Sequence, residues 1–293
     1  MKRKALRERS KGSIHPYVTE AESRKQHSDS PLCNSLIRAH PHCTQPMPPT
    51  TTPLETATAL LAQLEQRREP SYARFMALRT KVSSRPESVL GIRMKWLRQA
   101  SKQLSRLLSL DEAIDLLHPR ASAWYEYKIL FGGVLGRLAT AGEGTPLLYP
   151  LCDGWAVPDY YKEILAQWAR QDDAELQIVL RSLAEHARDA NPYARRLTVV
   201  AWLDLIRYDL VTPTTALQHI IPLQHDEAYY VQMAMAWLLA EMTLTGESSL
   251  VEAISTAITD STVLRMYQQK LRDSQRTAHP VAPPHAPLTS NEL

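Results

Sequence analysis

The sequence predicts an all-α fold, an α-solenoid in which antiparallel helix pairs stack side by side and leave one concave face. Three observations predict it. Apolar residues recur every three or four positions through nearly all of residues 53–276, and no segment alternates apolar and polar residues as a half-buried strand would. Glycine is scarce, at 9 of 293 residues, which argues against a turn-rich β protein.

Residues 1–52 form a tail without apolar periodicity. They carry nine Lys/Arg and four Asp/Glu and end in a Pro/Thr-rich run, so we expect them to be disordered. Their net charge of about +5 would raise non-specific affinity for a polyanion. The remaining residues, 25 basic and 27 acidic, are nearly neutral, so any polyanion-binding surface in the core must be local.

The first helices are predicted at 53–68, 71–81 and 94–108. The third is the clearest amphipath, with Leu97, Ala100, Leu104 and Leu108 along one side. A basic stripe lies on roughly the opposite side and consists of Lys95, Arg98, Lys102 and Arg106. A solvated outer face would also explain such a stripe. However, residues 71–106 hold nine Lys/Arg against one acid, whereas a merely soluble face mixes both signs.

The later helices are predicted at 123–139, 158–170, 174–190, 192–209, 213–223, 228–244, 248–259 and 262–276. Three of them begin at Pro158, Pro192 and Pro213, because proline at the first helical position loses no hydrogen bond. Trp202 and Trp237 lie 35 residues apart in similar apolar helices separated by a shorter helix. A two-helix unit of that length is typical of an α-solenoid. Residues 277–293 are Pro-rich and are expected to be disordered.

Several classes of protein are disfavoured by the composition. No run of about 18 apolar residues predicts a membrane span, and no apolar stretch follows the basic N-terminus as in a secretory signal. Three cysteines make no disulfide framework, which favours a cytoplasmic protein. Cys33, His40, His42 and Cys43 fit no standard zinc spacing, so we predict no metal and no cofactor.

Four residues are candidates for chemistry: Trp155, Asp159, Arg196 and Trp237. Each has an ordinary explanation, because acids are routine in a first helical turn and tryptophans at repeat positions are usually core. Arg195 and Arg196 lie at the start of a predicted buried helix, where positive charges oppose the helix dipole. This conflict indicates an anionic partner, or else the two side chains extend to solvent.

These residues lie in motifs that resemble the AlkD-like DNA alkylation repair family, whose fold is built of HEAT-like repeats. The resemblance covers most of residues 70–276. It runs through Val89-Leu-Gly-Ile-Arg93, Trp124-Tyr-Glu-Tyr-Lys128, Trp155-Ala-Val-Pro-Asp159, Asn191-Pro-Tyr-Ala-Arg-Arg196 and Tyr229-Tyr-Val-Gln-Met-Ala-Met-Ala-Trp237. Gly154 stands where family members often carry an aromatic residue, and Tyr193 where an indole is common.

The resemblance implies a monomeric glycosylase that cleaves the N-glycosidic bond of N3- or N7-alkylated purines in duplex DNA. It implies catalytic roles for Asp159, Trp155 and Trp237. Arg196 and Arg195, with the basic stripe Lys95, Arg98, Lys102 and Arg106, would contact DNA. A fixed carboxylate such as Asp159 can stabilise an oxocarbenium-like transition state, and indole faces attract a developing cation. The alternative is a non-catalytic HEAT-like scaffold that binds nucleic acid or protein, and it would not need Asp159 beside Trp155, Trp237 and Arg196.

Overall fold

The computed structural model describes residues 51–274, and within that range all regular structure is helical, with no β-strand. The α-helices are α2 (Pro53–Glu65), α3 (Pro70–Arg74), α4 (Met94–Leu107), α5 (Leu110–Ala123), α6 (Tyr125–Leu138), α7 (Ala141–Leu148), α8 (Ala156–Ala169), α9 (Asp173–His186), α10 (Pro192–Arg207), α11 (Pro213–Ile220), α12 (Tyr229–Thr243), α13 (Ser248–Ala257) and α14 (Ser261–Asp273). A π-helical turn, η1 (Phe75–Thr80), continues α3, and the 3-10 turns are η2 (Pro86–Ser88), η3 (Tyr149–Leu151) and η4 (Ile221–Leu223). The predicted all-α fold is confirmed. The predicted tails, with Cys33, His40, His42 and Cys43, lie outside the described residues, apart from residues 51 and 52.

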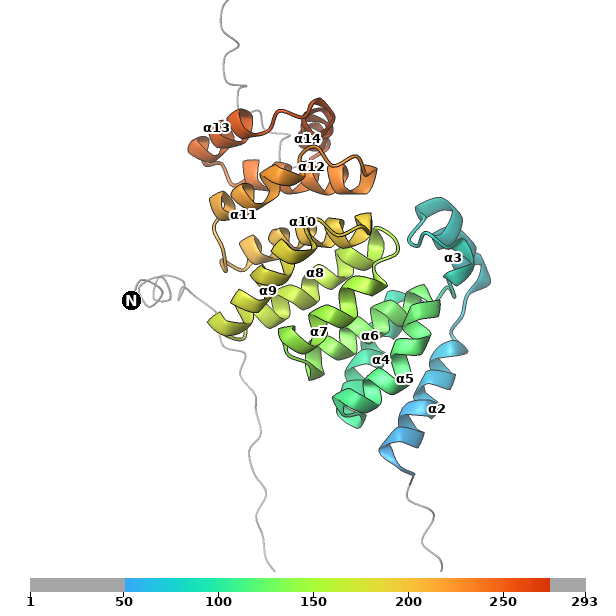
Figure 1. Ribbon diagram of the computed structural model, residues 1–293. Coiled ribbons are helices and arrows are strands. Elements are labelled where there is room, and N and C mark those ends of the chain that lie inside the picture. Colours follow the sequence, from blue (N-terminus) through green and yellow to red (C-terminus); the bar gives the residue numbers. More distant parts are fainter. Residues whose placement is uncertain (1–50, 275–293) are drawn as a thin grey trace, which may run out of the picture. The chain divides into compact units, whose positions relative to one another are not determined.

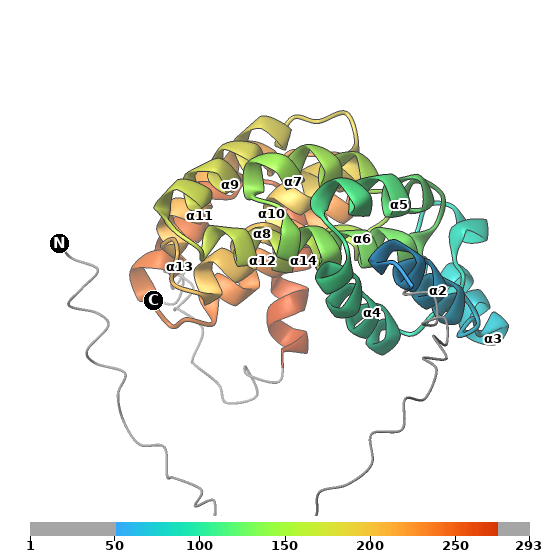
Figure 2. The same ribbon diagram turned by 90° about the horizontal axis from the view of Figure 1, so that it is seen from below.

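The helices stack in two layers, as Figures 1 and 2 show. One layer runs α4, α6, α8, α10, α12 and α14, each packed against the next, and we call it the even layer. The other layer consists of α5, α7, α9, α11 and α13, which pack on the even layer as the partners of successive helix pairs. This arrangement of stacked pairs is the predicted solenoid.

The central helices of the even layer, α6, α8, α10 and α12, are the most buried, and the close packing of α6 on α8 depends on small residues. Residues Tyr125 to Gly136 of α6 are all buried, which fits a helix that is apolar on nearly every side. A Cβ added at Gly132 would lie 2.5 Å from Cε1 of Tyr161 on α8. Glycine at this position therefore allows α6 and α8 to approach closely.

Helices α5 and α7 were not predicted, although each begins with a recognisable signal. Both begin with a capping box, in which a Ser or Thr side chain and a Glu three residues later satisfy each other's backbone N–H groups. The helix breakers Pro119 in α5, and Gly142, Gly144 and Pro146 in α7, obscured the periodicity. Gly144 faces Trp168, whose ring leaves no room for a side chain there, so tertiary packing outweighs helix propensity in α7.

No helix within residues 51–274 combines the length and apolarity that a membrane crossing requires.

Candidate functional site

The four candidate residues lie together and line one recess in the even layer. Trp155 and Asp159 come from the start of α8, Arg196 from α10 and Trp237 from α12. The recess has a volume of about 280 Å³, and its remaining lining residues are Tyr230, Met233 and Lys270. Residues from four helices, up to 115 positions apart in the sequence, therefore converge on one place.

Arg196 binds both carboxylate oxygens of Asp159. Its Nε donates a 3.0 Å hydrogen bond to Oδ1 of Asp159, and its Nη2 donates one of 3.0 Å to Oδ2. Its Nη1 donates to the backbone carbonyl of Tyr230 at 2.6 Å, which ties α10 to α12. The Arg196 side chain is 2% exposed and that of Asp159 is 19% exposed. Both residues line the recess, and the carboxylate is the more exposed member of the pair.

The Asp159 carboxyl has opposing influences on its pKa. Burial raises this pKa above its ordinary value, while the charge and hydrogen bonds of Arg196 lower it, and burial has the larger effect. The ammonium groups of Lys162 and Lys270 add smaller lowering effects. Asp159 also lies in the first turn of α8, where the helix dipole favours the ionised form.

Trp155 is held by the segment that precedes α4 in the chain. Its indole Nε1 donates a 2.9 Å hydrogen bond to the carbonyl of Thr80, the last residue of η1. A Cβ added at the neighbouring Gly154 would lie 2.2 Å from the backbone oxygen of Val82. The backbone of Val82 and Ser83 thus occupies the space of any side chain at position 154, which explains why glycine stands there instead of an aromatic residue.

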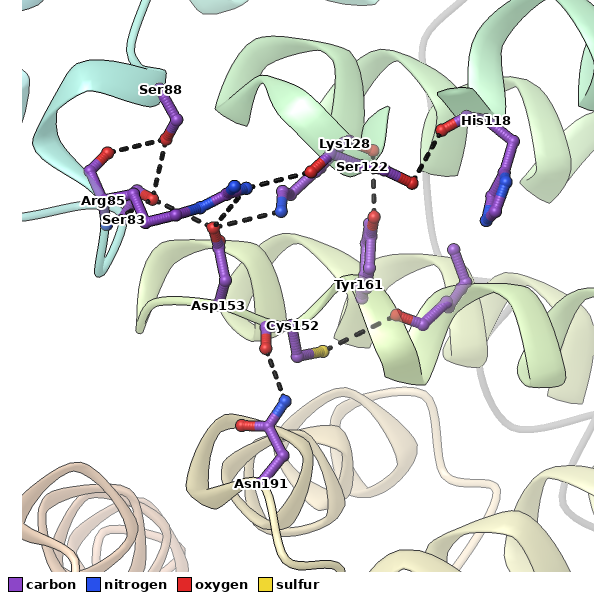
Figure 3. Close-up of polar contacts among 11 residues, drawn as sticks. Ser83, Arg85, Ser88, His118, Ser122, Lys128, Cys152, Asp153, Tyr161 and Asn191 are labelled. Atoms are coloured by element: carbon purple, nitrogen blue, oxygen red, sulfur yellow. Dashed lines mark hydrogen bonds and ion pairs between the residues drawn. The ribbon is translucent and has the colours of Figure 1, made fainter. Parts of the chain in front are cut away.

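A partly buried ionic cluster, in which the side chain of Arg85 is exposed, fixes the loop before Trp155 (Figure 3). Asp153 accepts from Nζ of Lys128 at 3.0 Å and from Oγ of Ser83 at 3.0 Å, and Arg85 lies 3.7 Å away. Asn191 adds a hydrogen bond to the carbonyl of Cys152 at 2.6 Å. No motif in the sequence predicts this cluster, although a lysine within the apolar run of α6 indicates that a buried partner is needed.

Trp237 differs from the tryptophans at the matching repeat positions. Trp168 and Trp202 are buried in the core, whereas Trp237 is half-buried and lines the recess. It also lines a second recess of about 480 Å³ with residues of α8, α10 and α12, among them Lys162 and Asp204. The repeat pattern alone would have placed all three tryptophans in the core.

Tyr230 and Lys270 line the recess but were not predicted. Tyr230 follows the N-terminus of α12, and its ring packs at 5.8 Å from that of Tyr193, the residue found where an indole is common. Lys270 is exposed in the last turn of α14. Tyr230 lay within a quoted motif, whereas no feature of the sequence connected α14 with Asp159.

The basic stripe of α4 is exposed, as predicted. Lys95, Arg98, Lys102 and Arg106 lie opposite the buried side of α4, which contains Leu97 and Leu104. Arg98 lies 3.5 Å from the carboxylate of Glu163, one helical turn beyond Asp159 on α8. This ion pair joins the stripe to the face of α8 that carries Asp159.

Arg195 does not line the recess. Its guanidinium binds both carboxylate oxygens of Asp226, at 2.6 and 3.0 Å, and the carbonyls of Asp189 and Ala190. The side chain ties together the loops before α10 and α12. A DNA contact by Arg195 stays a prediction.

Comparisons with known proteins agree with this architecture. A family model described as DNA alkylation repair enzyme matches residues 57–277. A solved structure, a predicted DNA alkylation repair enzyme from Enterococcus faecalis, superposes with a TM-score of 0.57. It is 16% identical and covers 71% of this chain and 98% of its own, a likeness that shows the fold alone. No curated protein matches the chain.

Proposed function

The chain belongs to the DNA alkylation repair enzyme family, and from that premise we propose that it is a DNA glycosylase acting on N3- and N7-alkylated purines in duplex DNA. Family membership supports a role in DNA repair and the binding of DNA. The alkylpurine substrate, the glycosylase reaction and the roles of single residues are the proposal.

The observation that carries this proposal is the Asp159 carboxylate, which Arg196 holds at the recess between Trp155 and Trp237. An alkylated purine of this kind already carries a positive charge, so its bond to the sugar is weak. As that bond breaks, its electron pair leaves with the purine and the positive charge moves to the sugar. A carboxylate fixed in advance lowers the energy of that charge without reorganisation.

The reaction ends when water adds to the sugar carbon. The base leaves as a neutral alkylpurine, and the water contributes a hydroxyl to the sugar and releases a proton. Asp159 would orient this water as well as stabilise the cation. The indole rings of Trp155 and Trp237 would attract the same charge through their faces.

Arg196 acts in this proposal as a positioning residue. Its guanidinium is almost fully buried, so it orients Asp159 and favours the ionised carboxylate. Lys270 at the recess and the basic stripe of α4 are left to attract phosphates. The recess is small for an extruded purine nucleotide with its sugar and phosphate, which supports a reaction on a base that stays outside any deep pocket.

One observation favours the alternative of a non-catalytic scaffold. Both carboxylate oxygens of Asp159 are already bonded to Arg196, as in a purely structural ion pair. The two functions differ in chemistry, because only an enzyme breaks the glycosidic bond.

Incubation of the full chain with duplex DNA treated with a methylating agent tests the proposal. Chromatography should detect free 7-methylguanine or 3-methyladenine, and the DNA should gain alkali-labile abasic sites. Repair by direct removal of the alkyl group would instead leave neither product. Binding to the duplex without either product, and without loss of the lesions, would support the scaffold.

Cys152 is not placed to accept an alkyl group, because it is buried and burial raises the pKa of its thiol.

A further inference from the structure

Two of the most exposed large apolar side chains lie next to the candidate site. Phe75 is 51% exposed and Leu78 is 59% exposed, and both belong to η1. We call residues 70–81, which form α3, η1 and its C-cap Lys81, the protruding segment; it lies between α2 and α4 in the chain, and Figure 1 shows α3 at one side of the stacked layers. Contiguous exposed apolar surface marks a binding site, and these two side chains lie three residues apart on one short element.

The protruding segment is strongly basic. It contains Arg74, Arg79 and Lys81, all exposed, and no acidic residue. None of the ion pairs found within residues 51–274 involves these three side chains. The surface therefore presents apolar side chains among positive charges that none of those ion pairs neutralises. Duplex DNA fits this combination, because its phosphates are negatively charged and its stacked bases are apolar.

The segment is continuous with the candidate site. The carbonyl of Thr80 accepts the indole hydrogen bond of Trp155, and the N–H of Ser84 donates to the carbonyl of Asp153 at 2.7 Å. Phe75 lies five residues before Thr80, so the exposed apolar groups and Trp155 belong to one connected unit.

The protruding segment is anchored underneath. Ala77 and Val82 are buried, and the guanidinium of Arg93 lies 3.9 Å from the ring of Tyr72, which stacks on Phe75. Lys81 ends η1 in the left-handed conformation, with a φ of 51°, which is uncommon for a residue other than glycine and caps the helical turn. The exposed groups are thus presented by a fixed backbone.

We infer that Phe75 and Leu78 form a wedge that inserts between base pairs of the bound duplex beside the lesion. The inference rests on the proposed function, since it takes duplex DNA as the partner. Apolar side chains that enter a base step unstack it and kink the duplex, while neighbouring cations bind the phosphates. Unstacking next to the lesion would free its sugar to approach Asp159 without a deep base pocket.

Fluorescence of 2-aminopurine, which rises when the base is unstacked, measures the wedge directly. The probe is placed at successive positions beside a stable abasic-site analogue in a short duplex, and the full chain is added to saturation. Wild type should increase the fluorescence at one or two positions. Phe75→Ala/Leu78→Ala should lose most of this increase and bind the duplex about tenfold more weakly, since one stacking contact is worth roughly 1–3 kcal/mol. The dependence of this variant's affinity on salt concentration should equal that of wild type.

Two matched variants separate the wedge from simpler effects. Leu54→Ala removes a comparably exposed leucine, 43% exposed at the start of α2, and should behave as wild type. Arg79→Gln/Lys81→Gln should keep the fluorescence increase but flatten the dependence of log Kd on log salt by up to about 2, because each lost phosphate contact contributes about 0.9. Melting temperatures should stay within about 2 °C of wild type, as is usual for exposed positions.

The outcomes distinguish the wedge from the proposed function. If Phe75→Ala/Leu78→Ala keeps the full fluorescence increase and affinity while wild type releases alkylpurines, the wedge is wrong and the glycosylase stands. If the variant loses the increase although wild type releases no alkylpurine, the wedge stands and the enzymatic proposal fails. If wild type does not bind the duplex, both are overturned.

Discussion

Asp159 has a local environment that could not be read from the sequence. The motif placed Trp155 and Asp159 near each other, and the resemblance added Arg196 and Trp237, so the four residues were predicted to meet. The depth of each side chain was not predictable, because it depends on how α8, α10 and α12 pack. Arg196 is almost fully buried against Asp159, and its contact with DNA stays a prediction, while Lys270 reaches the recess from a helix with no motif.

The pKa of Asp159 predicts how activity depends on pH. The proposed chemistry needs the ionised carboxylate, and burial raises its pKa above the ordinary value. Single-turnover base release should therefore fall as pH decreases through a pKa higher than that of a free aspartate. The folded state binds the proton of Asp159 more tightly than the unfolded state does. The contribution of this group to the free energy of unfolding should therefore fall as pH rises through the pKa of Asp159 in the folded protein, whereas the rate should rise over the same range. A rate that is constant down to pH 4, in protein that is still folded, would contradict this assignment.

Gly154 should not tolerate a methyl group. In Gly154→Ala the new Cβ would meet the backbone of Val82 and Ser83, which cannot move aside cheaply. We expect a loss of about 1–3 kcal/mol in the free energy of unfolding, measured by urea denaturation. Gly142→Ala is the matched control, since its Cβ would meet only Oγ1 of Thr140 at 4.0 Å and alanine favours the helix. Equal stability of the two variants would show that the contact of residues 80–84 with Gly154 is wrong.

At the scale of elements, periodicity identified most of the helices but missed α5 and α7. Ser109 and Glu112, like Thr140 and Glu143, form capping boxes that could have located both helix starts. Prolines and glycines inside these helices broke the pattern. The π-helical form of η1 has no signal in the sequence, since the predicted helix at 71–81 gave no reason for an extra residue per turn.

The ion pair between α6 and the loop before α8 gives a prediction at this scale. Lys128→Met would leave Asp153 charged in a largely buried place, so the free energy of unfolding should fall by roughly 3 kcal/mol. Combining it with Asp153→Asn should cost less than the sum of the two single changes, because they share one interaction. A double-mutant cycle by urea denaturation measures this coupling. Strict additivity would mean that the pair does not hold the loop.

At the scale of the whole molecule, the excess of positive charge is confined to particular surfaces. The core is nearly neutral, yet the basic stripe of α4 lies in the even layer and is joined to α8 through Arg98 and Glu163. The positions of Lys and Arg in the sequence predict this local excess of positive charge. The packing of α4, α6 and α8 shows in addition that the basic stripe lies in the same layer as Asp159.

Salt dependence tests whether that layer binds DNA. Lys102→Gln should lower affinity for undamaged duplex and reduce the slope of log Kd against log salt by about 0.9, the value expected for one phosphate contact. Arg181→Gln, an exposed change on α9 of the other layer, should leave the slope unchanged. Fluorescence anisotropy at four salt concentrations measures both. The reverse pattern would place the DNA on the layer of α5, α7, α9, α11 and α13.

The most direct test of the central claim is the single-turnover rate of alkylpurine release from methylated duplex DNA, at protein concentrations that saturate the substrate. Asp159→Asn should fold, bind DNA and release base at least about 100-fold more slowly than wild type, as expected when a preorganised electrostatic group is removed. Asp115→Asn makes the same chemical change at an exposed position of α5 and should leave the rate unchanged. Release by Asp159→Asn at the wild-type rate would contradict the account.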